Sequence, residues 1–190
     1  MSDTARAIST SIDNLPELLA DAFVLIVSYL SPPERALFAI FDRCCNPEVR
    51  QLILSETSWE TLDFGLLQED VASNLTDNEL SSILFYIDAR HNVKTLKMNG
   101  CSGIVGYGLG PLRRSTVIEE LELSIVRKGP QGVDLEQDLV LDEQIVVPIL
   151  SSSLPPAIES SSLFVIHFPQ YWRDNKNPVL TAFLRRGSSI

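Results

Sequence analysis

The chain has 190 residues, 45% of them hydrophobic and 21% charged, which is enough for one compact domain or for a small module joined to a second one. With 15 Lys and Arg against 25 Asp and Glu, its formal net charge of −10 disfavours binding to nucleic acid or to an anionic membrane surface. No apolar run approaches the roughly 20 residues that span a bilayer, and no signal peptide is apparent at the start. Three cysteines, two of them adjacent, form no disulfide framework, so we expect a cytoplasmic or nuclear protein.

The N-terminal part predicts a disordered lead-in over residues 1–13 and a small helical module over residues 14–58. From Asn14 the apolar residues recur with the period of an amphipathic helix, with Phe23, Ile26, Val27 and Leu30 in its buried stripe. Ser31-Pro32-Pro33-Glu34 provides a capping hydroxyl, two first-turn prolines and a reciprocating Glu for a second helix. Asn46-Pro47-Glu48 starts a third. The module is therefore expected to contain three short helices.

From Trp59 onward, short apolar pairs alternate with helical segments, and this alternation predicts an α/β domain over residues 59–190. Each pair has one residue between its members, as in a very short strand with one buried face. The pairs are Leu62 and Phe64, Leu96 and Met98, Leu121 and Leu123, and Leu163 and Val165. Helical patterns follow over residues 77–87, 107–114, 144–154 and 178–186. Since parallel strands need such crossovers, we expect the four strands to be parallel neighbours in one sheet.

An acidic insertion over residues 129–144 separates the last two predicted repeats. It contains Asp134, Glu136 and Asp138 and no basic residue. It is either a solvated loop between repeats or an acidic recognition loop for a basic partner. On the strands, Lys97 and Glu122 are the strand-face side chains expected to contact a partner protein.

The N-terminal pattern resembles an F-box over residues 14 to about 65. The similarity rests on Leu15-Pro16-Glu17-Leu18-Leu19, on the apolar helix that ends in Tyr29-Leu30, and on Trp59-Glu60-Thr61-Leu62-Asp63. The inner Trp common in the family is absent near Cys44-Cys45.

The second part resembles the cysteine-containing type of leucine-rich repeat. The segment Leu96-x-Met98-x-x-Cys101-x-x-Ile104, continued by Gly108-Leu109-x-x-Leu112, has that repeat's spacing. Leu75-Thr76-Asp77 supplies the Thr-Asp form of the motif one unit earlier. The fold implied is a short solenoid with parallel strands and convex helices, closed by an atypical unit that includes Tyr171-Trp172.

Together these resemblances imply the substrate-receptor subunit of a Skp–cullin–F-box ubiquitin ligase, which is an adaptor and not an enzyme. The partners implied are a Skp-type adaptor, the cullin ligase core and an unidentified substrate protein. The residues assigned to adaptor binding are Leu15, Pro16, Leu18, Val24, Leu25, Leu30 and Pro33. The alternative is a non-ligase repeat scaffold in which the helical module caps the apolar end of the solenoid.

Searches of the sequence for catalytic and metal-binding patterns give no active site. His91 and His167 have no metal-ligand spacing with a cysteine, and Cys101 is expected to be a buried thiol. The glycines at 100–110 lack the spacing of a phosphate-binding loop and fit repeat turns with positive φ. Arg113-Arg114 fits a helix-end or rim pair. We therefore expect no cofactor and no metal.

Overall fold

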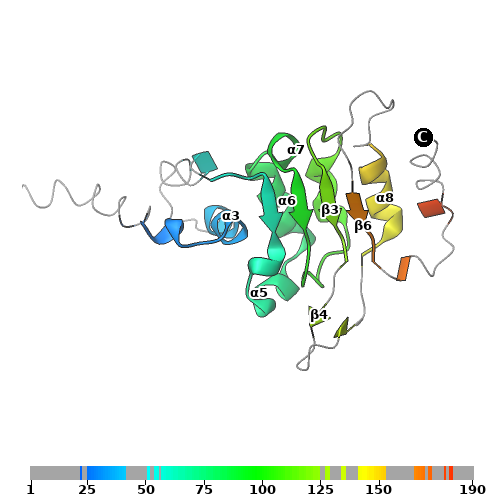
Figure 1. Cartoon of the computed structure of the whole chain (residues 1–190), viewed down its shortest axis with the longest axis horizontal. Coiled ribbons are helices and arrows are strands. Elements are labelled where there is room, and N and C mark those ends of the chain that lie inside the picture. Colours follow the sequence, from blue (N-terminus) through cyan, green and yellow to red (C-terminus); the bar gives the residue numbers. More distant parts are fainter. Residues whose placement is uncertain are drawn as a thin grey trace, which may run out of the picture. The chain divides into compact units, whose positions relative to one another are not determined.

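The computed structural model (Figure 1) describes residues 22, 25–41, 51, 54–55, 57–124, 127–128, 134–135, 141–152, 165–169, 171–172, 178 and 180–181. The chain divides into two compact units, Met1–Thr57 and Ser58–Ile190. The predicted lead-in over residues 1–13 and most of the predicted first and third helices lie outside the described residues.

The described part of the first unit is built around α3 (Pro32–Phe41), which begins where the sequence predicts. The backbone N–H and the hydroxyl of Ser31 both donate to Glu34 Oε2, at 2.7 Å each, so the Glu reciprocates as expected. Arg35 joins α3 to the preceding turn, because its Nε donates to the Leu30 carbonyl at 2.9 Å and its Nη2 to the Ser28 carbonyl at 3.1 Å.

One expectation for the first helix is wrong. Val27 is buried against Ala39, Phe38 and Leu54, but Ile26, which was placed in the same buried stripe, is 55% exposed. Neighbouring helical residues point about 100° apart, so the face covered by the small Ala39 is too narrow to bury both. Helical residues 25–28 therefore keep an apolar surface in contact with solvent.

The second unit contains the parallel sheet that the sequence predicts (Figure 1). Its strands are β1 (Thr61–Asp63), β2 (Thr95–Lys97), β3 (Glu120–Glu122) and β6 (Val165–His167), in the spatial order β1-β2-β3-β6. Leu62, Leu96 and Leu121 are in register with one another and fully buried. This part of the prediction is confirmed.

The fourth strand differs from the prediction in its register. Ile166, and not Leu163 or Val165, pairs with Leu121, and Val165 is exposed. Residues 163–166 read Leu-Phe-Val-Ile, so both alternating sets are apolar and the pattern alone does not determine the buried face. The backbone pairing with β3 determines it, for example through Leu123 N–H to the His167 carbonyl at 2.8 Å.

Helical segments connect the strands, as parallel pairing requires. They are η1 (Phe64–Leu66), α5 (Glu69–Asn74), α6 (Asp77–Tyr86), α7 (Ala89–Asn92), the 3₁₀ helix η2 (Tyr107–Leu112) and α8 (Glu143–Ser151). α6 begins at the predicted capping box, with Thr76 N–H donating to Glu79 Oε2 at 2.8 Å and Glu79 N–H to Thr76 Oγ1 at 3.4 Å. The short α5 and α7 are not predicted by the sequence pattern.

The core of this unit lies between the sheet and the helical segments, with η2 packed against both α6 and α8. Its largest members are fully or nearly fully buried apolar side chains: Leu62, Phe64, Leu80, Ile83, Leu84, Leu96, Met98, Ile104, Leu109, Leu112, Leu121 and Trp172. Position 106 requires glycine because α8 packs closely against it: an added Cβ would lie 2.5 Å from Val146 Cγ2. Gly106 also has φ +125°, which residues with a side chain rarely adopt. Gly100 also has a positive φ, of +81°, as expected for repeat turns.

The segment predicted as one acidic insertion contains more regular structure than expected. β4 (Arg127–Lys128), which lies just before the segment, forms a short antiparallel pair with β5 (Asp134–Leu135) within it. At its end Asp142 caps α8, its Oδ1 accepting from the Gln144 N–H at 2.7 Å. Asp142 and Glu143, which are also in this segment, therefore belong to a helix start and not to a loop. The helix dipole favours negative charge at that position.

The C-terminal side of the unit is attached through two aromatic residues of the predicted closing unit. Tyr171 Oη and Trp172 Nε1 both donate to the Leu141 carbonyl, at 2.8 and 3.1 Å, and Trp172 is buried. Burial is the main cause that raises the pKa of Tyr171 to about 12, so its hydroxyl remains a donor at neutral pH. These bonds hold the chain after β6 against the start of α8.

Candidate functional site

One face of the parallel sheet is polar and open to solvent. Because side chains alternate along a strand, the residues that flank the four central apolar positions all point to the face opposite the core. We call this set the open face: Thr61, Asp63, Thr95, Lys97, Glu120, Glu122, Val165 and His167. Each is half-buried or exposed. Each strand therefore contributes two adjacent positions to one continuous surface.

The two strand residues that the sequence singles out lie side by side on the open face. Lys97 and Glu122 are directly opposite each other in the register of β2 and β3. Asp63 pairs with Lys97 on one side, and His167 with Glu122 on the other. The charges therefore alternate across β1, β2 and β3, and His167 extends the polar row onto β6.

The charges of this region partly neutralise one another. Lys97 Nζ lies 3.7 Å from Glu120 Oε1, and at the strand starts Lys94 Nζ lies 2.7 Å from Glu60 Oε1. The hydrogen bond to Glu60 is the main cause that raises the pKa of Lys94. Ser124 Oγ donates to Glu122 Oε1 at 2.6 Å. Lys97, Glu120 and Glu122 of the open face therefore each have a neighbouring polar group.

The acidic residues predicted for substrate binding are not brought together with this face by any observed contact. Asp134 is in β5, which belongs to the separate two-stranded sheet. Glu136 and Asp138 lie outside the described residues. Asp142 and Glu143 are at the start of α8, where burial first and Asp142 second raise the pKa of Glu143.

The residues assigned to adaptor binding are described only in part. Leu25 is 60% exposed, whereas Leu30 is half-buried and Pro33 is buried. Leu15, Pro16, Leu18 and Val24 lie outside the described residues. The structure adds Ile26 and Tyr29, which is 82% exposed, to the apolar surface around Leu25. The helical pattern predicts that Ile26 is buried. Its exposure becomes apparent only from the structure, in which α3 covers Val27 but not Ile26.

Cys101 is a buried thiol, as the sequence predicts. It follows β2, and its Sγ lies 3.9 Å from the Asn99 carbonyl oxygen. Burial, with a smaller contribution from the Asp63 charge, raises the pKa of this thiol to about 12. At neutral pH it is fully protonated, which is the opposite of what a nucleophile needs.

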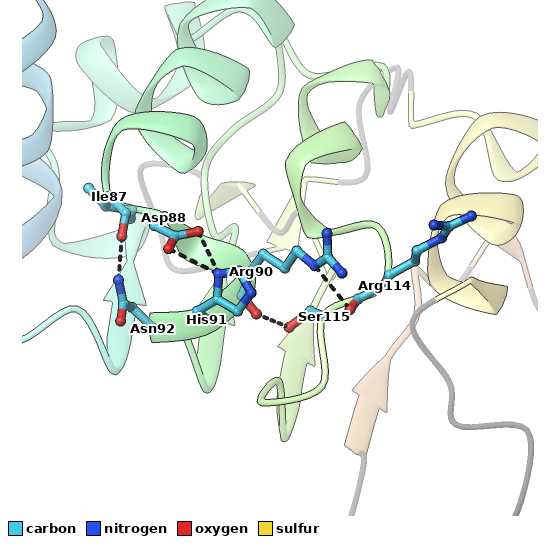
Figure 2. Close-up of polar contacts among 7 residues, drawn as sticks. All are labelled: Ile87, Asp88, Arg90, His91, Asn92, Arg114 and Ser115. Carbon is cyan, nitrogen blue, oxygen red and sulfur yellow. Dashed lines mark hydrogen bonds and ion pairs between the residues drawn. The ribbon is translucent and has the colours of Figure 1, made fainter.

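A second polar cluster lies on the turns that precede β2 and β3 (Figure 2). Arg90 Nε donates to the Arg114 carbonyl at 3.3 Å, and Ser115 Oγ donates to the Arg90 carbonyl at 2.9 Å. Asp88 contacts His91 Nδ1 through both carboxylate oxygens, at 2.9 and 3.0 Å. We call the exposed basic side chains Arg90, His91, Arg113 and Arg114 the basic edge. The sequence marks Arg113-Arg114 only as a rim pair, because the contact with Arg90 is tertiary.

Two absences hold for the part of the chain that the structure describes. It contains no cluster of three or more His, Cys, Asp or Glu side chains arranged to hold a metal ion. Its helices are all too short or too polar to cross a membrane.

No family model, no curated protein and no solved structure matches the chain.

Proposed function

We propose that the chain is a substrate-receptor subunit of a cullin-type ubiquitin ligase. In this proposal the N-terminal unit is a divergent F-box that docks on a Skp-type adaptor. The α/β unit is a short leucine-rich-repeat-like array that holds the substrate protein. Other subunits carry out the transfer of ubiquitin, so the chain itself is an adaptor and not an enzyme.

The observation that carries the proposal is the exposed apolar surface of the first unit. Leu25, Ile26 and Tyr29 are 60%, 55% and 82% exposed, on a helix whose sequence resembles the adaptor-binding part of an F-box. Clustered large apolar side chains on a surface indicate a protein partner. At about 25 cal/mol per Å² of apolar area, covering three such side chains is worth several kcal/mol of binding free energy.

The architecture of the second unit supports the substrate-holding role. Each of the four strands supplies one apolar residue to the core and its flanking residues to the open face. Repetition of one strand and one crossover segment is the pattern of a solenoid, whose sheet face is a common binding surface. The alternating charges of Asp63, Lys97 and Glu122 would give such a surface specificity for a partner of complementary charge.

The second candidate is a non-ligase interaction scaffold in which the helical unit caps the repeat array. In that candidate Leu25, Ile26 and Tyr29 would cover the apolar end of the array, whereas in the first proposal they would contact the adaptor.

Co-purification separates the two candidates. The full chain, expressed together with a Skp-type adaptor, is expected to elute with the adaptor as a stoichiometric complex. A folded chain that elutes alone at micromolar concentration would contradict the ligase proposal and favour the scaffold.

A further inference from the structure

The two turns that carry the basic edge are joined by hydrogen bonds. These turns lead into β2 and β3, which are paired in parallel, so the turns lie at the same end of the sheet. The bonds between Arg90 and Arg114 and between Ser115 and Arg90 join the two turns directly, and Ser115 is buried (Figure 2). Asn92 Nδ2, which donates to the Ile87 carbonyl at 2.8 Å, fixes the first turn internally.

Arg113 and Arg114 of this edge differ from Lys94 and Lys97, which have anionic partners. Lys94 is paired with Glu60 and Lys97 with Glu120. By contrast, the side chains of Arg113 and Arg114 make no hydrogen bond or ion pair with any residue that the structure describes. The one carboxylate in the cluster, that of Asp88, is bound to His91. The edge is thus locally positive in a chain whose net charge is −10.

The backbone at Arg114 has a conformation that is unfavourable for a residue with a side chain. Arg114 follows η2 with φ +60°, in the left-handed region where glycine is the preferred residue after a helix end. Asp88, which follows α6 in the same cluster, has φ +49°. Non-glycine residues held in this conformation are destabilising and gather at sites of function. An arginine here weakens the fold slightly and adds an exposed guanidinium.

We propose that the basic edge binds an acidic segment of a partner protein, through Asp and Glu carboxylates or through phosphorylated side chains. Guanidinium groups bind both with paired, charge-assisted hydrogen bonds. A short peptide is favoured over a long polyanion because the net charge of −10 repels every part of a polyanion that extends beyond the edge. The inference concerns the second unit and does not depend on whether the first unit binds a Skp-type adaptor.

The test measures binding of labelled peptides to the full chain by fluorescence anisotropy, at or below about 0.1 M salt, where the Debye length is about 10 Å. The probes are a short Glu-rich peptide, the same peptide with Gln for Glu, and the Gln peptide with phosphoserines added. We expect the chain to bind the Glu probe, the phosphoserine probe or both, and not to bind the Gln probe. The two anionic probes distinguish carboxylates from phosphates as the source of the negative charge. No binding of either anionic probe would overturn the proposal, as would tighter binding of single-stranded DNA of equal charge.

Variants show whether the basic edge is the binding site. Arg113→Gln combined with Arg114→Gly is expected to weaken peptide binding roughly threefold to tenfold, since each exposed ion pair contributes little and two are lost. The control, Lys94→Gln, removes one charge from a residue that is already paired with Glu60 and should change binding less than about twofold. Equal losses per charge removed in the double variant and in the control would mean that net charge and not the basic edge controls binding, and would overturn the assignment.

Arg114→Gly alone distinguishes a binding role from a structural one. The melting temperature should stay the same or rise, because glycine relieves the positive φ. Peptide binding should weaken at the same time. A variant that binds the peptide as tightly as the wild type would overturn the role of Arg114.

Discussion

Asp77 provides the strongest test of how the repeat-like segments are held together. Its carboxylate, in the first turn of α6, accepts three backbone N–H groups from the segment that leads into η2: Val105 at 2.9 Å, Gly106 at 3.0 Å and Gly108 at 2.6 Å. Two of these bonds go to Oδ1 and the Val105 bond goes to Oδ2. In Asp77→Asn an NH₂ group must replace one of the oxygens. With the two Oδ1 bonds kept, this group faces the Val105 N–H and leaves that donor without an acceptor.

The cost of that change can be estimated from the lost hydrogen bond. A buried or half-buried donor without a partner costs about 1–3 kcal/mol, and the charge at the helix start adds about 0.3–1 kcal/mol. With a urea m-value of about 2 kcal/mol/M, a loss of 2 kcal/mol lowers the unfolding midpoint by about 1 M. Urea titration followed by circular dichroism measures this shift.

Asp70→Asn is the matched control, because Asp70 is also in the first turn of a helix, α5, but is exposed. It should lose only the helix-dipole contribution of about 0.3–1 kcal/mol. If Asp77→Asn and Asp70→Asn shift the midpoint equally, the three backbone bonds do not stabilise the fold and the reasoning is refuted.

Three further predictions concern the core of the second unit. Gly106→Ala should destabilise this unit by about 2–4 kcal/mol, because φ is +125° and the added methyl group would meet Val146. Gly110 has open space around its Cα, so Gly110→Ala should change the free energy of unfolding by less than about 1 kcal/mol. Equal urea midpoints for the two variants would contradict this prediction. Cys101 should resist iodoacetamide at pH 8 until the chain unfolds, because its thiol pKa is raised to about 12, and rapid labelling of the folded chain would contradict its burial. Its contribution to stability should be complete below pH 9, the pKa of the unfolded thiol, and should be lost as pH rises toward 12; unfolding midpoints of the wild type and Cys101→Ala over this range measure it.

The features that the sequence predicts correctly are those encoded by local patterns. Leu62, Leu96 and Leu121 each lie between polar residues, so alternation identifies both the strand and its buried face. The helix start at Thr76 and Glu79 requires only side chains and backbone groups within four residues. Alternation also places Lys97 and Glu122 on the same face of the sheet. The pairing of β2 with β3 then makes these two residues neighbours.

Other features depend on tertiary contacts and have no local signal. Strand β6 has apolar residues in both alternating sets, so its register follows from pairing with β3. β4 and β5 have two residues each, which is too short for any periodic pattern. The 107–112 segment forms a 3₁₀ helix with Pro111 inside it, where the spacing of Leu109 and Leu112 suits either helix type. The contact between Arg90 and Arg114 joins turns 24 residues apart in the chain.

The most direct test of the proposed function compares two leucines of nearly equal exposure. Leu25 in the first unit is 60% exposed and Leu66 in the second is 58% exposed, so replacing either by Asp should change the stability by no more than about 0.5 kcal/mol. Leu25→Asp should abolish binding to a purified Skp-type adaptor in a calorimetric titration, because an unpaired carboxylate in an apolar interface costs several kcal/mol. Leu66→Asp should bind as the wild type does. Unchanged binding of Leu25→Asp, or an equal loss in both variants, would contradict the proposal that this helix is the adaptor-binding surface.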